Sequence, residues 1–345
     1  MDPFTLEIIK NALVAAGDEM FTTLQRTAQS SLIFEVLDFA VGATDGAGNL
    51  ITQGNGVPGF IGTLDKSVES VLAKHGTDGG IADGDIFLTN DPYGGGGTHL
   101  SDVSIVMPVF YGDALVAFTV NKAHWSELGG KDPGSISADA TEIYQEGLQL
   151  PNIKLFNRGE ADQAVIDMLA ANVRLPDQTL GDMWAGVAAA RMGARRIIEL
   201  IDKYGLDTFR AAVADQLDYG ERMTRLELAK LPKGTFAAED WLDDDGMGNG
   251  PFKIKVAVTI ADDAVTFDYT GTCPQTPGPV NLSYTGLLCA VRMIFKAITN
   301  PAIPVNGGAF RPIRLICPEG TIFNARRPAA ISIYYEAVAF AADVA

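Results

Sequence analysis

Two of the three histidines in the chain lie close to aspartates and to a run of glycines. His99 and Asp102 follow the four consecutive glycines 94–97 in the segment NDPYGGGGTHLSD, and His124 occurs in the segment KAHWSELGG. Imidazole nitrogens and carboxylate oxygens are ligands that Zn²⁺ and Mn²⁺ accept in proteins. A glycine run lets the backbone approach a ligand closely, because no Cβ atom interferes. The residue types and their spacing therefore indicate a candidate site for a divalent metal.

The elements around these residues should bring His124 next to the other two. Apolar and polar residues alternate over 103–110, which predicts a half-buried strand, and 115–120 is the expected return strand of a hairpin. Antiparallel pairing places the end of the second strand beside the beginning of the first. We therefore expect His124 to lie close to His99 and Asp102, although the two histidines are far apart in the sequence.

Asp38 is the candidate for a fourth ligand. It lies in the apolar segment VLDFAVGA, inside the stretch 34–44, which is typical of a strand. A lone carboxylate in an apolar strand costs free energy unless it is paired or bound to a metal. We therefore expect Asp38 to be buried beside the histidines.

The same residues also fit a purely structural role. In this alternative, His99 caps or lines a turn and His124 is a loop histidine with satisfied hydrogen bonds. Asp91 and Asp102 are then turn carboxylates, which hydrogen bonding to nearby backbone favours. Spacing alone leaves both alternatives open. The third histidine, His75, ends a predicted helix, where a cation suits the helix dipole, and is assigned no role in a site.

Other chemistries lack their sequence signals. The chain contains no P-loop, no nucleotide-binding glycine fingerprint and no GxSxG motif. The acidic run 239–245 lacks the ligand pattern of a calcium-binding EF-hand, so it predicts a surface turn. The cysteines Cys273, Cys289 and Cys317 are odd in number and widely spaced, which argues against a disulfide scaffold or a cysteine zinc site. Cys289 lies on an apolar helix face and is expected in the core.

Composition narrows the class of protein further. The 345 residues include 26 Lys and Arg against 43 Asp and Glu, a formal net charge of −17. This charge argues against binding nucleic acid or an anionic membrane through a basic surface. Hydrophobic residues make up 47% of the chain, as in a folded globular protein. No export signal or membrane-spanning stretch is recognised, so we expect a cytoplasmic protein.

The order of the expected elements predicts a mixed α+β fold and excludes a Rossmann fold, since regular βαβ alternation is missing. We expect a β-rich region with the metal site at 1–158, a helical region at 159–232, and a β-rich region with one long helix at 233–345. The expected helices are 4–30, 64–75, 161–174, 177–203, 206–217 with a tail to 228, and 281–299. The expected strands are 34–44, 49–52, 86–88, 103–110, 115–120, 252–260, 264–269 and 313–317, and the glycine-rich segment 121–135 is expected to be a loop.

Eight segments together resemble the hydantoinase B/oxoprolinase family. They occur in family order across nearly the whole chain: DPFTLEIIKNAL, LDFAVGATDGAGNLITQ, NDPYGGGGTHLSDV, KAHWSELGGKDPGS, TEIYQEGLQLPNIKLF, NVRLPDQTLGDMWA, YTGTCPQTPGPVN and PVNGGAFRPI. This family comprises the B-type subunits of ATP-dependent hydantoinases, 5-oxoprolinases and related lactamases, and it is also found in acetone and acetophenone carboxylases.

The resemblance implies a subunit of a hetero-oligomer that works with an A-type partner of actin-like ATPase fold. The partner uses ATP to phosphorylate a cyclic amide, or a ketone in the carboxylases. The B-type subunit is expected to hold a divalent metal, Mn²⁺ or Zn²⁺, where the activated intermediate reacts. The implied metal ligands are Asp38, His99, Asp102 and His124, and the candidates for general base or substrate-orienting residue are Glu127, Glu142 and Glu146.

Three hypotheses follow from the resemblance. The first is the metal-bearing subunit of an ATP-dependent cyclic-amide hydrolase, and the second is a subunit of an ATP-dependent ketone carboxylase. Family members usually continue well beyond the segment RRPAAISIYY, so we expect this chain to be a fragment or the product of a truncated gene. The third hypothesis is therefore a catalytically inert scaffold that only binds the partner.

Overall fold

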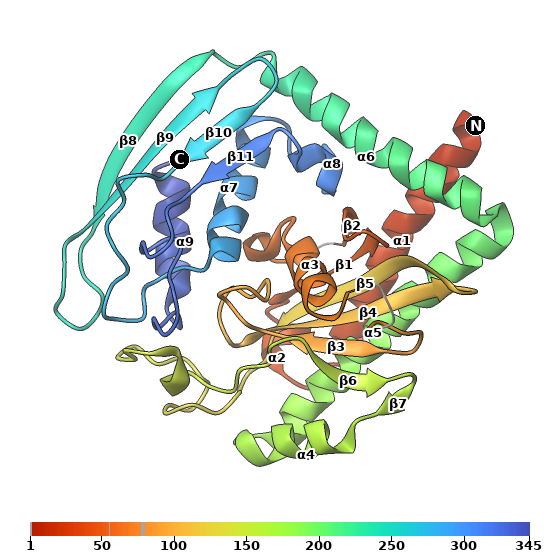
Figure 1. Ribbon diagram of the computed structural model, residues 1–345, viewed down its shortest axis with the longest axis horizontal. Helices are drawn as coiled ribbons and strands as arrows, with labels where there is room; N and C mark the ends of the chain where they lie inside the picture. The colour runs from red at the N-terminus through yellow and green to blue at the C-terminus, as the bar shows by residue number, and fades with distance from the viewer. Residues whose placement is uncertain (1, 55, 77–79) are drawn as a thin grey trace.

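The computed structural model describes residues 2–54, 56–76 and 80–345, which form two β-sheets with helices packed against them (Figure 1). The larger sheet has seven strands in the order β2-β1-β5-β4-β3-β6-β7, and all of its neighbouring strands are antiparallel. The smaller sheet has the order β11-β10-β9-β8, with one parallel pair, β10–β11. The prediction of a mixed α+β fold is confirmed.

The β4–β5 hairpin lies at the centre of the larger sheet. As predicted, β4 and β5 are antiparallel, and their register pairs Asp102, the first residue of β4, with His124, the last residue of β5. The predicted hairpin of β1 and β2 is present as well. The strands are β1 (Phe39–Asp45), β2 (Leu50–Gln53), β3 (Ile86–Thr89), β4 (Asp102–Tyr111), β5 (Ala114–His124), β6 (Ile153–Asn157) and β7 (Glu160–Ala161).

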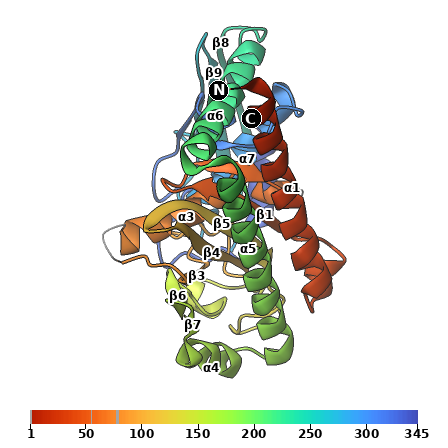
Figure 2. The ribbon, with the colours of Figure 1, turned by 90° about the vertical axis from the view of Figure 1, so that its right-hand side faces the viewer.

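Helices cover both faces of this sheet. Helices α1 (Pro3–Thr27) and α5 (Pro176–Tyr204) lie side by side on one face (Figure 2). Helix α3 (Leu64–His75) packs on the other face, where its apolar residues share a core with β1, β4 and β5. The prediction that β4 is half-buried is therefore wrong, because its polar face is also covered. Ser104 on that face is satisfied by a hydrogen bond between its hydroxyl and that of Ser67 at 2.9 Å.

The segment before β1 differs from the prediction of a continuous strand over 34–44. Residues Ser31–Phe34 form a short helix, α2, and the strand begins only at Phe39. Leu37 has a φ of +63°, which turns the chain between the two elements. Asp38 therefore lies just before the strand, and its side chain is 29% exposed, so the expectation of a buried acid within a strand is wrong. A short apolar run does not distinguish helix from strand, which explains the error.

Three long helices follow the larger sheet, as predicted. They are α4 (Gln163–Asn172), α5, and α6 (Leu206–Leu228), which continues unbroken over the expected tail. The side chain of Asp162 caps α4, and Gly205, with a φ of +82°, separates α5 from α6. The predicted loop 121–135 begins later than expected, because residues 121–124 belong to β5, where 121–123 pair with both β1 and β4 and His124 pairs with β4.

The smaller sheet carries α7 (Tyr284–Ile298) and α9 (Tyr334–Asp343), which share its core. Its strands are β8 (Gly234–Leu242), β9 (Phe252–Ile260), β10 (Val265–Asp268) and β11 (Ile313–Ile316). Residues 239–242 of the acidic run belong to β8, so the predicted surface turn is wrong for that half. An edge strand exposed on both faces lacks the apolar alternation that would reveal it. The short elements are η1 (Pro58–Phe60), η2 (Ile143–Gln145) and α8 (Gly307–Phe310).

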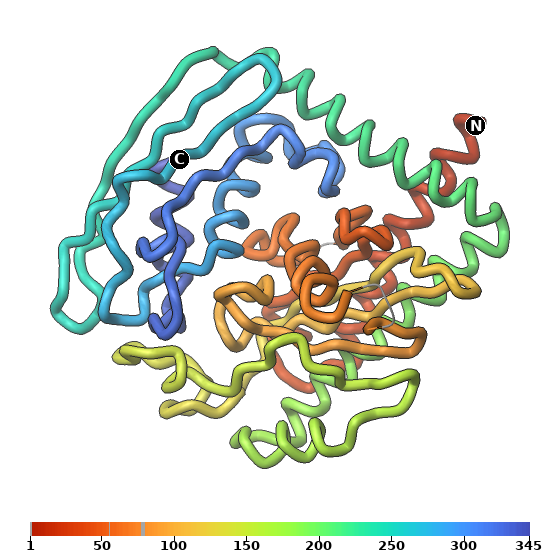
Figure 3. The backbone as a smooth tube through the Cα atoms, in the orientation of Figure 1, coloured from red at the N-terminus to blue at the C-terminus, as the bar shows by residue number. Residues whose placement is uncertain are grey.

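The segment before α9 contacts the loop that joins β5 to β6 in the larger sheet. The tube in Figure 3 shows the dark blue segment before α9 beside the yellow-green loop that joins β5 to β6, and Ile143 of this loop donates a hydrogen bond to the carbonyl of Pro328 at 2.8 Å. All three cysteines are free thiols, and Cys289 is buried as predicted. Within the described residues, no helix is both long and apolar enough to cross a membrane. The three-region division of the chain stays a prediction.

Candidate metal centre

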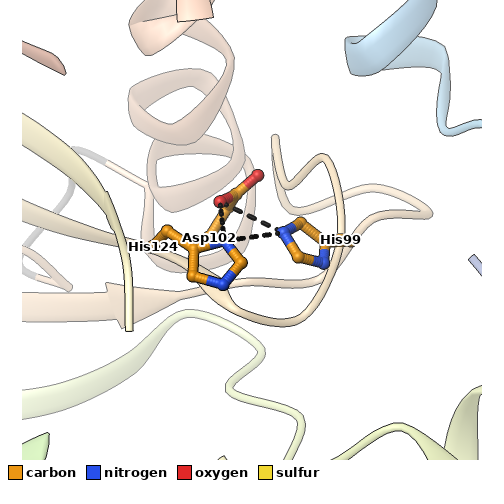
Figure 4. A group of neighbouring side chains, drawn as sticks. All are labelled: His99, Asp102 and His124. Atoms are coloured by element: carbon orange, nitrogen blue, oxygen red, sulfur yellow. Dashed lines mark hydrogen bonds and ion pairs between the residues drawn. The ribbon is translucent and has the colours of Figure 1, made fainter. Parts of the chain in front are cut away.

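Three side chains converge at the open end of the β4–β5 hairpin, opposite its turn (Figure 4). His99 comes from the loop before β4, Asp102 begins β4, and His124 ends β5. All three residues are buried, and one ligand atom from each lies within 4.8 Å of the others. The hairpin therefore brings His124 beside His99 and Asp102, at the place where antiparallel pairing was expected to put it.

The carboxylate of Asp102 lies at the centre of this cluster. Its Oδ1 is 3.2 Å from Nε2 of His99 and 3.5 Å from Nδ1 of His124, and the two nitrogens are 3.3 Å apart. Its Oδ2 accepts a hydrogen bond from the hydroxyl of Thr98, whereas Oδ1 is buried without a well-directed donor. A buried carboxylate oxygen without a partner is costly. Two imidazole nitrogens and this oxygen therefore make a donor set that fits a divalent cation.

Asp38 lies at the rim of the cluster. Its Oδ2 is 3.8 Å from Nδ1 of His124, and its backbone carbonyl accepts a hydrogen bond from the backbone N–H of His124 at 3.0 Å. The structure therefore brings together all four residues that the sequence suggested as ligands. Asp38 differs from the other three in being partly exposed to solvent.

The charges within the cluster shift the pKa values of its acids in opposite directions. Burial acts to raise the pKa of Asp102, but the charges of the neighbouring His99 and His124 rings outweigh it and hold this pKa well below its ordinary value. Burial and the neighbouring negative charge of Asp102 raise the pKa of Asp38. Asp102 is consequently the fixed negative charge of the cluster.

The glycine run that precedes His99 packs against helix α3. Gly96 has a φ of +74°, and a Cβ atom at this position would lie only 2.4 Å from the backbone nitrogen of Ser67. The buried ammonium group of Lys122 donates a hydrogen bond to the carbonyl of Gly96 at 2.7 Å. Gly96 is therefore needed for close packing of the loop on α3, and this packing helps to fix the loop that carries His99.

A cavity of about 410 Å³ opens onto the cluster. Its lining combines Asp38 and the two histidines with apolar, aromatic and hydroxyl side chains: Leu32, Ser126, Ile136, Ser332, Tyr334 and Tyr335. The ring of Tyr334 stacks on the ring of His99, with centroids 4.6 Å apart and an interplanar angle of 25°. Tyr334 was not among the predicted site residues. Only its presence in the segment RRPAAISIYY could have drawn attention to it.

The three candidate glutamates occupy different environments, and none of them is among the residues that line the cavity. Glu127 is buried, and its carboxylate accepts hydrogen bonds from the backbone N–H of Gly134 at 3.1 Å and from Arg174 at 3.0 Å. Glu142 is exposed and caps the short helix η2.

Glu146 is buried between two segments of the chain. Its Oε1 accepts hydrogen bonds from the backbone N–H groups of Ile331, at 2.6 Å, and Ser332, at 2.8 Å. Burial raises the pKa of Glu146 to about 7, although these N–H groups act to lower it. Glu127 and Glu146 thus each hold a residue of the cavity wall, Gly134 and Ser332 respectively.

The other residues considered from the sequence lie outside the cluster. His75 ends α3 as predicted, and its Nε2 lies 2.9 Å from the carbonyl of Asn152. Asp91 accepts a hydrogen bond from the backbone N–H of Tyr93 at 3.1 Å, as a turn carboxylate does, and forms an ion pair with Arg327 at 3.0 Å.

Comparisons with known proteins give a consistent result. The family model described as hydantoinase B/oxoprolinase matches residues 2–345. A relative from Pseudomonas sp. (strain NS671), named as the putative B-type subunit of a D-/L-hydantoinase, is 35% identical over 349 residues, which cover 95% of this chain and 58% of that protein. The chain therefore spans less than two thirds of the length of that relative.

Two solved structures share the fold. The ATP-dependent caprolactamase from Pseudomonas jessenii matches with a TM-score of 0.93 and 32% identity, over 99% of this chain and 59% of that one. A nucleotide-free acetone carboxylase matches with a TM-score of 0.89 over 99% of this chain and 47% of that one. Its identity is only 17%, so the second likeness shows the fold alone.

Proposed function

The chain belongs to the hydantoinase B/oxoprolinase family, as its eight sequence segments indicated, and on that premise we propose that it is the metal-bearing B-type subunit of an ATP-dependent cyclic-amide hydrolase. An A-type partner would phosphorylate the cyclic amide with ATP, and the activated amide would react in the cavity of this chain. The observation that carries the proposal is the convergence of His99, Asp102 and His124, two of which, the histidines, line this cavity.

Four residues would hold the metal. His99, Asp102 and His124 supply buried ligand atoms, and Asp38 supplies a carboxylate at the rim, close to the cavity. When bound, Mn²⁺ or Zn²⁺ supplies Lewis acidity, which polarises a carbonyl or phosphoryl oxygen and lowers the pKa of water.

The protein's own residues would orient the substrate. The cavity places Leu32, Ile136 and the two tyrosines beside the polar cluster, so a small ring can contact apolar side chains while its amide faces the histidines. We propose that Glu127 and Glu146 orient the walls of this cavity, because they hold Gly134 and Ser332 through backbone hydrogen bonds.

Sequence identity favours a hydrolase over a ketone carboxylase. The relative named as part of a hydantoinase and the caprolactamase structure are 35% and 32% identical to this chain. The acetone carboxylase structure, at 17%, supports only a common fold. The carboxylase hypothesis is therefore kept as an outcome of the test.

Turnover by the chain together with its partner tests the proposal. The full chain is co-expressed with the A-type subunit, and ATP-dependent ring opening of hydantoin, 5-oxoproline and caprolactam is measured beside bicarbonate-dependent consumption of ketones. We expect ATP-dependent opening of a cyclic amide. The H99A variant should lose this activity, since it removes a metal ligand, whereas the matched H75A variant should keep it, because His75 lies outside the cluster.

Two results would contradict the proposal. Bicarbonate-dependent consumption of a ketone without amide hydrolysis would assign the chain to the carboxylases. A stable complex with the partner that holds metal and turns over neither class of substrate would favour the inert scaffold.

A further inference from the structure

Tyr334 connects the second half of the chain to the metal cluster. It is the first residue of helix α9, which packs in the core of the smaller sheet. Its ring nevertheless stacks on His99, a residue of the larger sheet's loop, with centroids 4.6 Å apart. Tyr335 meets the ring of Tyr334 edge-on, with centroids 6.4 Å apart, and is 51% exposed.

The chain just before Tyr334 is fixed at many points. We call residues 327–333 the closing segment. Arg327 forms an ion pair with Asp91 at 3.0 Å, and its guanidinium lies over the ring of Tyr93, 4.7 Å from the centroid. The next anchors are hydrogen bonds to backbone carbonyls of the closing segment: Ile143 N–H to Pro328 at 2.8 Å, Tyr93 hydroxyl to Ala329, and Asn281 side chain to Ala330 at 3.0 Å.

The last part of the closing segment is bound to the loop between β5 and β6. Glu146 accepts from the backbone N–H groups of Ile331 and Ser332, and the hydroxyl of Ser332 donates to the carbonyl of Ser137 at 2.7 Å. Backbone held at successive residues has little freedom left to move the side chain that follows it. The closing segment therefore fixes where the ring of Tyr334 lies.

An imidazole ring needs such a contact to keep one orientation. The χ2 torsion of histidine is broad, so neighbouring groups must select the ring orientation. A metal-binding histidine is commonly held by a group outside the ligand set, and loss of that group weakens metal binding. The ring of Tyr334 covers one face of His99, and Nε2 of His99 faces Asp102 at 3.2 Å.

We propose that Tyr334 is a positioning residue for the metal site, whose ring holds the imidazole of His99 with Nε2 directed at Asp102 and His124. It acts through His99 and rests on the proposed metal site. Because the closing segment fixes Tyr334, the second half of the chain contributes to metal affinity without supplying a ligand.

Metal titration of the full chain tests this inference. The affinities for Zn²⁺ and Co²⁺ are measured by chelator competition for the wild type and for Y334F, Y334L and Y334A, together with the visible absorption spectrum of each Co²⁺ form. Y334F keeps the stacked ring, so its affinity should stay within about twofold of the wild type. Y334L and Y334A should bind about tenfold more weakly, with an altered Co²⁺ spectrum. The matched control Y144L changes an exposed tyrosine that does not line the cavity, and it should bind as the wild type does.

The outcomes separate the inference from the proposed function. Wild-type affinity in Y334L would overturn the role of Tyr334, even though the metal site itself remains. Y334L also decides the matter if circular dichroism shows that Y334A does not fold, since leucine fills most of the space of the ring. A wild-type chain that binds no metal would instead contradict the proposed function, and the inference with it.

Discussion

At the scale of residues, the buried carboxylates differ in how they are satisfied. The carboxylate of Glu127 accepts hydrogen bonds from an arginine and from backbone N–H groups. Asp102, beside two histidines, has a buried oxygen without a well-directed donor. Buried polar atoms are usually hydrogen-bonded, so this oxygen, which lies beside two imidazole nitrogens, would be available as a ligand for a cation. Glu146 Oε2 and Asp182 Oδ2 are also buried without a hydrogen-bond partner, although both residues lie outside the cluster.

Glu146 should make the stability of the chain depend on pH. Its pKa is raised from 4.5 to about 7 in the folded chain. Between these values the folded state keeps a proton that the unfolded state releases, so the stabilising contribution is complete below about pH 4.5 and is lost as the pH rises through about 7. E146Q does not titrate, so its free energy of unfolding relative to the wild type should increase by up to about 3 kcal/mol across this window.

Urea denaturation at a series of pH values measures this difference. E142Q is the matched control, because it replaces an exposed glutamate of the same loop. Parallel stability curves for E146Q and the wild type would show that the carboxyl group of Glu146 is not protonated in the folded chain.

At the scale of elements, the glycine run lies in the connection between β3 and β4, and Gly96 of this run packs against α3. Gly96 combines a positive φ with a backbone contact that leaves no room for a Cβ atom, whereas a Cβ at Gly94 would meet nothing within 4 Å. A side chain at position 96 would therefore clash with the neighbouring backbone, whereas position 94 has room for one.

This difference predicts unequal effects of the same substitution. G96A should lower the free energy of unfolding by about 1–3 kcal/mol, because the methyl group overlaps the backbone of α3 and alanine disfavours a positive φ. G94A should change it by less than about 1 kcal/mol, with stabilisation expected from the smaller entropy of the unfolded chain. Chemical denaturation of both variants checks the pair, and an equal loss in the two would contradict the packing described for the loop.

The sequence correctly predicted elements in which the spacing of apolar residues matches the face that the element buries. Helix α3 and strand β9 have the predicted bounds. The predicted pairing of β4 with β5 is also correct, and it puts His124 beside Asp102. Strand β8 was missed because it is exposed on both faces and its acidic residues are typical of a turn. The strand predicted over 34–44 begins five residues later than expected, at Phe39, because the short apolar run before it carries no period that separates helix from strand.

At the scale of the whole molecule, the site is assembled from both halves of the chain. The larger sheet supplies the candidate ligands, and the start of α9 supplies a wall and the ring that covers His99. Motif spacing and one hairpin were enough to predict that His99, Asp102 and His124 lie together, because their proximity depends on local strand pairing. Tyr334 could not be predicted in this way, since its position results from the anchors of the closing segment on loops far away in the sequence.

The metal content of the chain tests the central claim most directly. Elemental analysis of the full chain, purified without chelators, should find about one divalent ion per chain. H99A and H124A should lose this ion, because each removes one imidazole nitrogen from the cluster, whereas H75A should retain it. A wild-type chain without metal, or H99A and H124A variants with the full wild-type content, would contradict the account.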